Sequence, residues 1–218
     1  MLRHPINANL SLHNESAYNG FPIQESKGPF IREYLGRLQQ TIDRALMEHP
    51  RTFAFRVDLR LPVMDDILHR SHSNELLDRF MESFKAKIRH NRSLAKQKNA
   101  SAHDSAVRYV WTKEHGQHGS PHYHLLFLLN HDAYNTLGSF SVGKSNLFNR
   151  IQEAWASALS LPVDAVQGLV EIPNNPTYRV FSNDLNSQAE LFYRASYLCK
   201  MATKEYGDGT HAFGCSRI

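Results

Sequence analysis

The feature that most constrains the fold is the segment PHYHLLFLL, residues 121–129, which ends in five consecutive apolar residues. A short apolar run bounded by turn residues is typical of a strand that is buried on both faces. Residues 106–114 also have strand character, and a Gly-containing stretch, HGQHGSP, joins them to the apolar run. We therefore predict a β-hairpin whose second strand is central and rigid in its sheet.

Further strands and helices are expected around this hairpin. Residues 51–61 (RTFAFRVDLRL) alternate apolar and polar side chains, which predicts a half-exposed strand. Apolar residues at three- and four-residue steps predict helices in four places. The first lies between Pro29 and Pro50, and the second follows an expected cap at Asn74. The third and fourth helices are expected at residues 145–159 and 187–204. Two short strands are expected between them, at residues 168–172 and 178–181. This order predicts an α+β fold, with helices packed on a central antiparallel sheet.

The N-terminal part has a different composition from the rest. Residues 1–28 are polar and rich in Asn, Ser, Gly and Pro, which predicts a loosely ordered arm. With the helix that follows, it would form an N-terminal helical extension, residues 1–50. The main domain would be residues 51–218.

The composition excludes several classes of protein. With 218 residues the chain is long enough for a core without a disulfide or metal. No stretch approaches the roughly 20 apolar residues of a membrane span, so we expect no membrane partner. The N-terminus has no signal pattern, and the two cysteines form no framework. We expect a cytoplasmic protein.

The charge favours a polyanionic partner, since the net charge is +4 and the pI about 9.1. The end of the second helix carries no acid and six cations: Lys85, Lys87, Arg89, Arg92, Lys96 and Lys98. One interpretation is a ridge that contacts phosphates. The other is a solvated helix end whose charges oppose the helix dipole.

Six of the thirteen histidines fall within residues 103–131. His122 and His124 flank a tyrosine, and alternate residues of a strand share one face, roughly 6.7 Å apart. Two such imidazoles can converge on one divalent ion, or they can simply cap a core strand. Glu114, across the hairpin, would add the oxygen ligand that Mg²⁺ or Mn²⁺ prefers. His115 and His118 are alternative third ligands.

The C-terminal segment YRASYLCK places Tyr193, Tyr197, Lys200 and Lys204 on one face of the predicted helix. Aromatic residues at this spacing are often core. Here a separate apolar face is already present, so a reactive stripe is the second interpretation. A phenol is a weak nucleophile until a metal or cation stabilises its oxyanion.

Residues 138–145, GSFSVGKS, match the P-loop pattern formally. No strand runs directly into the glycines, so we interpret them as a loop. Ser145 would cap the next helix and Lys144 would contact DNA.

The two reactive segments together resemble a known group of enzymes. EHGQHGSPHYH resembles the metal-binding segment of His–hydrophobe–His replication initiators, and YRASYLCK resembles the Tyr-x-x-x-Tyr-x-x-Lys segment of two-tyrosine initiators. The ending GDGTHAFGCSR and the length look most like the inovirus replication-initiator-like (YagK/YfjJ) family of phages and prophages. The resemblance covers roughly residues 50–218.

This resemblance implies a ferredoxin-like or palm-like endonuclease fold and a protein that acts in a bacterial host. It also implies roles for individual residues. His122 and His124 would bind Mg²⁺ or Mn²⁺ with Glu114. Tyr197 would be the leading nucleophile, Tyr193 the second and Lys200 the assisting cation. Ser196 stands where related enzymes often carry a second lysine, so a single-tyrosine enzyme fits equally well.

The resemblance further implies a function and partners. The chain would be a site-specific nickase and strand transferase that cuts single-stranded DNA at a replication origin through a phosphotyrosine link, initiating rolling-circle replication of a phage or prophage. A host helicase is a further candidate partner. The alternative is a non-catalytic nucleic-acid-binding protein of replication or regulation. A P-loop ATPase is a third hypothesis.

Overall fold

The central strand of the sheet is β7 (Pro121–Asn130), the strand predicted from its apolar run. In this computed structural model, which describes residues 2–62, 73–115, 121–207 and 209–217, β7 pairs antiparallel with β6 (Arg108–His115) and β5 (Arg51–Arg60). The edge strands also pair antiparallel. Strand β10 (Phe213–Cys215) pairs with β6, while β8 (Val170–Glu171) and β9 (Thr177–Phe181) pair with different stretches of the same edge of β5. The predicted antiparallel sheet is therefore confirmed.

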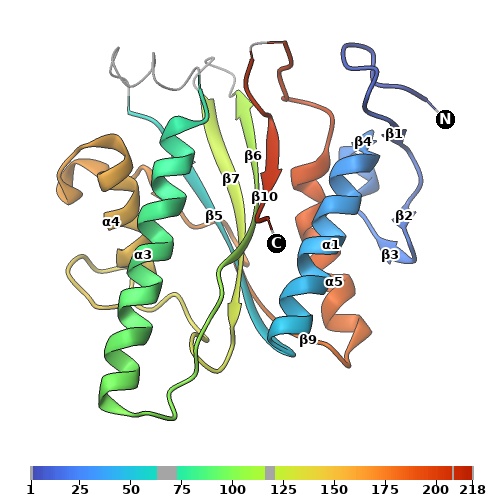
Figure 1. Ribbon diagram of the computed structural model, residues 1–218. Helices are drawn as coiled ribbons and strands as arrows, with labels where there is room; N and C mark the ends of the chain where they lie inside the picture. Colours follow the sequence, from blue (N-terminus) through green and yellow to red (C-terminus); the bar gives the residue numbers. More distant parts are fainter. Residues whose placement is uncertain (1, 63–72, 116–120, 208, 218) are drawn as a thin grey trace.

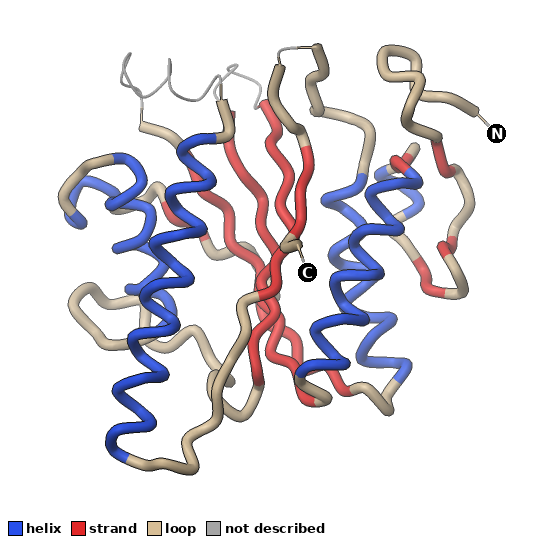
Figure 2. The backbone as a smooth tube through the Cα atoms, in the orientation of Figure 1, coloured by secondary structure: helices blue, strands red, loops and turns tan. Residues whose placement is uncertain are grey.

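Helices cover both faces of this sheet, giving three layers (Figures 1 and 2). Helices α3 (Glu75–Lys98) and α4 (Leu147–Leu159) share a core with Leu125 and Phe127 of β7. Helices α1 (Arg32–Glu48) and α5 (Leu185–Ser196) share a second core with Leu126 and Leu128. Since successive side chains of a strand point to opposite faces, burial on both faces requires an unbroken apolar run in β7.

Helix α1 is part of this three-layer core. Its buried side chains pack with Ala54 of β5 and with Leu126 and Leu128 of β7. The boundary predicted at residue 50 therefore cuts through one shared core, and α1 is not an appended extension. A 3.6-residue period predicts a helix with an apolar stripe, but it does not say against what that stripe packs.

The N-terminal arm is packed rather than loosely ordered. It holds β1 (Leu12–His13), β2 (Ala17–Tyr18), β3 (Phe21–Pro22), the short 3-10 helix η1 (Glu25–Lys27) and β4 (Phe30–Ile31). Leu10 and Ile23 are buried, and β1 pairs with β4. The polar composition conceals a few apolar anchors that are enough to fix the segment.

The last helix ends eight residues earlier than predicted. Helix α5 stops at Ser196, a 3-10 turn η3 (Tyr197–Cys199) follows, and Lys200 is extended. The arm supplies the reason. The Gln24 side chain donates to the carbonyls of Tyr193 and Arg194, and the Met201 N–H donates to the Pro29 carbonyl. These partners replace the hydrogen bonds that a longer helix would have made.

The P-loop-like segment is a loop, as expected, but its helix cap is different. Asn146 rather than Ser145 is the cap of α4, and its side chain accepts from the Asn149 N–H. The Gly143 N–H donates to the Asn149 side chain at 2.9 Å, so this amide is occupied within the protein.

A 3-10 helix η2 (Val163–Val166) follows α4. Among the described helices, none is long and apolar enough to cross a membrane.

Candidate functional site

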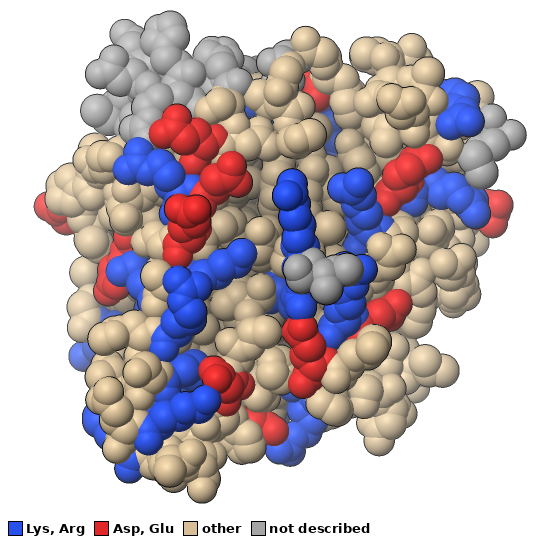
Figure 3. Space-filling view, in the orientation of Figure 1, with Lys and Arg blue, Asp and Glu red and all other residues tan. Residues whose placement is uncertain are grey.

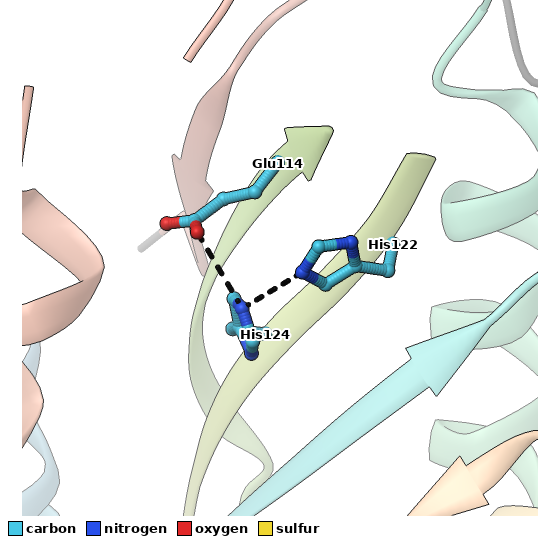
Figure 4. A group of neighbouring side chains, drawn as sticks. All are labelled: Glu114, His122 and His124. Carbon is cyan, nitrogen blue, oxygen red and sulfur yellow. Dashed lines mark hydrogen bonds and ion pairs between the residues drawn. The ribbon is translucent and has the colours of Figure 1, made fainter. Parts of the chain in front are cut away.

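Three potential metal ligands meet at one end of the hairpin (Figure 4). His122 and His124 lie on β7 and Glu114 on the adjacent β6, where it is opposite His122 in the register. The Nε2 atoms of the two imidazoles are 3.1 Å apart, and His124 Nε2 is 3.6 Å from Glu114 Oε2. One ligand atom from each residue lies within 4.8 Å of the others. The sequence-predicted trio is thus brought together, on the face of the sheet covered by α1 and α5.

Asp58 holds one of these histidines from the other side. It lies opposite His124 in the β5–β7 register, and its Oδ1 is 2.7 Å from His124 Nδ1. A carboxylate on Nδ1 favours the tautomer whose Nε2 lone pair is free. That nitrogen is the one directed toward Glu114 and His122. Sequence reasoning missed Asp58, although the polar face of the 51–61 alternation contained it.

Two lysines from the C-terminal segment bind the Glu114 carboxylate. Lys200 Nζ is 2.9 Å from Oε2, and Lys204 Nζ is 3.4 Å from Oε1. All three side chains are almost fully buried. Helical spacing predicts Lys204 on the reactive stripe, but the two lysines reach Glu114 from a non-helical segment that contains a turn.

Tyr197 stands against this cluster. Its ring centroid is 5.8 Å from that of His124, and Lys200 Nζ donates to its hydroxyl at 2.6 Å. The buried Arg56 guanidinium also lies over this ring, 5.6 Å from its centroid. The phenol, the lysine, the acid and a histidine therefore form one continuous set of contacts. The alternation in residues 51–61 predicts Arg56 on an exposed strand face, and it does not predict the position of this side chain beside the tyrosine.

The other predicted nucleophile lies elsewhere. The Tyr193 side chain is 46 % exposed on α5, and it is the Tyr193 carbonyl that Gln24 and Ser196 contact. Because the helix ends at Ser196, Tyr193 and Tyr197 do not continue one helical stripe into the lysines. Of the alternative third ligands, His115 pairs with Glu205 at 3.4 Å, and His118 lies outside the described residues.

The predicted phosphate-contacting residues are not next to the trio. They lie on α3, which covers the face formed by Tyr123, Leu125 and Phe127, whereas His122 and His124 point to the opposite face. Lys144 lies on the α3 side as well, lining the same cavity as Lys87. The sheet therefore separates the basic ridge from the histidines.

Burial and pairing shift the ionisation of the cluster. Burial acts to raise the pKa of Glu114, but contacts with His124, Lys204 and Lys200 outweigh it and leave that pKa below its usual range. Burial also opposes charge on His124, yet Asp58 and Glu114 raise its pKa. Burial lowers the pKa of Lys204 to about 8. The acid is thus held as a carboxylate, the form that binds metals.

The donor set fits a divalent cation. Bonds of about 2.1 Å at octahedral angles place neighbouring ligand atoms roughly 3.0 Å apart, close to the observed imidazole spacing. Two nitrogens and one oxygen suit Mn²⁺ better than Mg²⁺, which prefers oxygen. Three protein ligands leave positions for water or substrate.

The chain is similar to known proteins over most of its length. The family model of the YagK/YfjJ C-terminal domain matches residues 13–216. The chain belongs to this family. It is 34% identical over 200 residues to the uncharacterized protein YfjJ of Escherichia coli K12, covering 87% of this chain and 96% of YfjJ. It is 32% identical over 203 residues to the uncharacterized protein YagK of the same strain, covering 89% and 97%. No solved structure matches.

The family match confirms one part of the sequence interpretation. The YagK/YfjJ assignment, made from the ending GDGTHAFGCSR and the length of the chain, is correct. The match begins at residue 13 and so includes the arm and α1, in agreement with their packing against the sheet and the lysine segment.

Proposed function

We propose that this YagK/YfjJ-family protein is a metal-dependent nickase and strand transferase of the His–hydrophobe–His type, with a tyrosine nucleophile. Its substrate would be single-stranded DNA at an origin, cut to initiate rolling-circle replication of a phage or prophage. The observation that carries the proposal is the contact set around Tyr197. The hydroxyl is 2.6 Å from Lys200, and the ring lies against a histidine of the candidate metal trio.

Each described side chain has a role in this proposal. His122, His124 and Glu114 would hold the cation, and Asp58 would keep His124 in the ligating tautomer. Mn²⁺ or Mg²⁺ held there would polarise the scissile phosphate. Lys200 stabilises negative charge on the Tyr197 oxygen through its short hydrogen bond.

The covalent step balances as a phosphoryl transfer. The Tyr197 phenol gives up its proton to water, and its oxygen attacks the phosphorus in line. A Tyr–O–P bond forms as the bond to the 3′ oxygen breaks, and that oxygen leaves as a 3′-hydroxyl after taking a proton. The 5′ end stays linked to the protein. A hydroxyl attacking the same phosphorus later reverses the exchange and releases Tyr197.

The charges of the cluster also favour a phosphodiester. Arg56, Lys200 and Lys204 provide three cations against the carboxylates of Glu114 and Asp58. A bound divalent ion would add to this excess, and a phosphate would offset it. A peptide or sugar substrate would leave the excess uncompensated.

The direct experiment is covalent trapping. The full chain is incubated with end-labelled single-stranded DNA carrying candidate origin sequences and with Mn²⁺, then resolved in SDS. We expect a labelled band shifted to the mass of the protein, and we expect EDTA to remove it. A shifted band that persists in EDTA would exclude the metal from the mechanism. DNA binding without any adduct would favour the alternative, a non-catalytic nucleic-acid-binding protein.

Asp58→Asn tests the positioning of His124 independently of any activity. Loss of the carboxylate removes the partner that fixes the tautomer, so Mn²⁺ affinity measured by calorimetry should fall by about 10- to 100-fold. Asp132→Asn is the matched control, because Asp132 pairs with Arg51 at the far end of the sheet. Equal Mn²⁺ affinity in the two variants would contradict the role of Asp58.

A further inference from the structure

Helix α3 carries two rows of cations on its two sides. Lys85, Arg89, Arg92 and Lys96 follow one another at steps of four, three and four residues, which places them in one row. Lys87 and Lys98 are eleven residues apart, about three turns, and form a second row. In Figure 3, Lys and Arg side chains gather over the lower, C-terminal half of this helix.

Between residues 86 and 97, the crest between the rows is uncharged and open. It consists of exposed small or polar side chains: Ala86, His90, Ser93 and Gln97. The first row lines two neighbouring cavities, which share Arg89. The second row continues into a cavity where Lys87 faces Lys144 and Arg150 from α4 and its preceding loop. An exposed crest is thus bordered by cations on both sides.

This surface accounts for the positive charge of the protein. The three cavities are lined by three acids, Glu82, Asp104 and Glu153, and by eight cations: Arg79, Lys85, Lys87, Arg89, Arg92, Lys96, Lys144 and Arg150. The resulting net charge of +5 exceeds the +4 of the whole chain. The ion pair Lys96–Asp104 is exposed and the pair Lys87–Glu153 is partly exposed. Such pairs are weak, so a phosphate can replace the carboxylate at little cost.

We infer that α3 docks in the major groove of duplex DNA, with one cation row on each flanking phosphate backbone. A helix with side chains is about 10–12 Å wide and the major groove about 12 Å. The deep, narrow major groove of duplex RNA does not admit a helix, so the expected partner is DNA. The crest would face the base edges.

This duplex site is separate from the metal site. Helix α3 packs on Tyr123, Leu125 and Phe127, and the sheet lies between it and the face that carries His122 and His124. The inference therefore does not rest on the proposed nickase activity. Were both correct, the protein would grip duplex DNA on one face while a single strand is cut on the other.

Fluorescence anisotropy with labelled duplex DNA of about two helical turns tests the inference, using the full chain in EDTA so that nicking plays no part. Replacing Lys85 and Arg89 together by glutamine should weaken duplex binding about tenfold and lower the salt slope by about two. The matched control replaces Arg37 and Arg44 of α1 by glutamine and should bind like the wild type. Equal affinities of wild type and the Lys85/Arg89 variant would overturn the proposal.

A second variant separates groove insertion from simple charge attraction. Ala86→Trp adds bulk to the exposed crest without changing charge, so it should also weaken duplex binding by about tenfold. Its fold is checked by circular dichroism. Unchanged binding by Ala86→Trp would contradict insertion of the crest. Binding of duplex RNA as tight as that of duplex DNA, or a loss of single-stranded DNA binding in the Lys85/Arg89 variant as large as its loss of duplex binding, would contradict the assigned partner.

Discussion

Tyr197→Phe is expected to abolish the covalent DNA adduct. Phenylalanine keeps the ring against His124 and under Arg56, so the local packing is preserved. The substitution removes only the hydroxyl, which is the proposed nucleophile and the acceptor of the Lys200 hydrogen bond. The measurement is the yield of SDS-resistant adduct on end-labelled single-stranded DNA, which should fall below detection while DNA binding remains.

Two further tyrosine variants make this result specific. Tyr178→Phe is a matched control, since the Tyr178 hydroxyl donates to the Asn175 carbonyl away from the trio, and it should give the wild-type yield. Tyr193→Phe should also form the first adduct, because the Tyr193 ring is exposed on α5. Adduct formation by Tyr197→Phe, or its loss in Tyr193→Phe alone, would assign the nucleophile elsewhere.

Of the substitutions described, Glu114→Ala should lower the free energy of unfolding the most. The carboxylate pairs with two buried ammonium groups, and removing it leaves Lys200 and Lys204 without this anionic partner. Loss of one member of a buried ion pair typically costs about 3 kcal/mol or more. We expect a decrease of that size in the free energy of unfolding, measured by urea denaturation in EDTA at neutral pH. EDTA keeps metal binding out of the comparison.

A matched pair and a double variant test the cause of that decrease. Glu171→Ala removes an exposed partner of Arg60 on β8, and it should cost less than about 1 kcal/mol. Adding Lys204→Met to Glu114→Ala should recover part of the loss, because one unpaired buried charge is gone. If Glu114→Ala were no more destabilising than Glu171→Ala, the lysines would not depend on this carboxylate.

The strands show what local pattern can and cannot predict. The alternation in residues 51–61 sorted the β5 side chains correctly between the two faces. It also suggested that the polar face meets water, whereas Arg56 is buried. Period two reports which residues share a face, not what covers it. Here α5, η3 and the C-terminal lysines cover the end of that face. The alternation alone therefore could not identify Arg56 and Asp58 as site residues.

In the candidate site too, a local pattern predicts some features and not others. His122, His124 and Glu114 could be predicted because a hairpin fixes their distances locally. The contacts of Lys200 and Lys204 with Glu114 could not be predicted, because the helical spacing from Tyr193 onward fails at Ser196. There the chain exchanges helical hydrogen bonds for partners about 170 residues away, at Gln24 and Pro29. Such a long-range competition leaves no trace in a local period.

The position of the basic ridge was equally beyond local sequence. Cations on α3 were recognised from their run, but the face of the sheet on which the helix packs is decided by its connections and its apolar stripe. Figure 1 places α3 on one side of the sheet, and α1 and α5 on the other. The histidines face α1 and α5, so the basic ridge and the metal trio lie on opposite sides of the sheet.

The most direct test of the central claim is to identify the DNA-linked residue. After incubation with Mn²⁺ and single-stranded DNA, the adduct is digested with protease and nuclease, and the modified peptide is sequenced by mass spectrometry. The account predicts a nucleotide phosphate esterified to the hydroxyl of Tyr197. A phosphate on another side chain, or an unmodified Tyr197 peptide at full recovery, would contradict it.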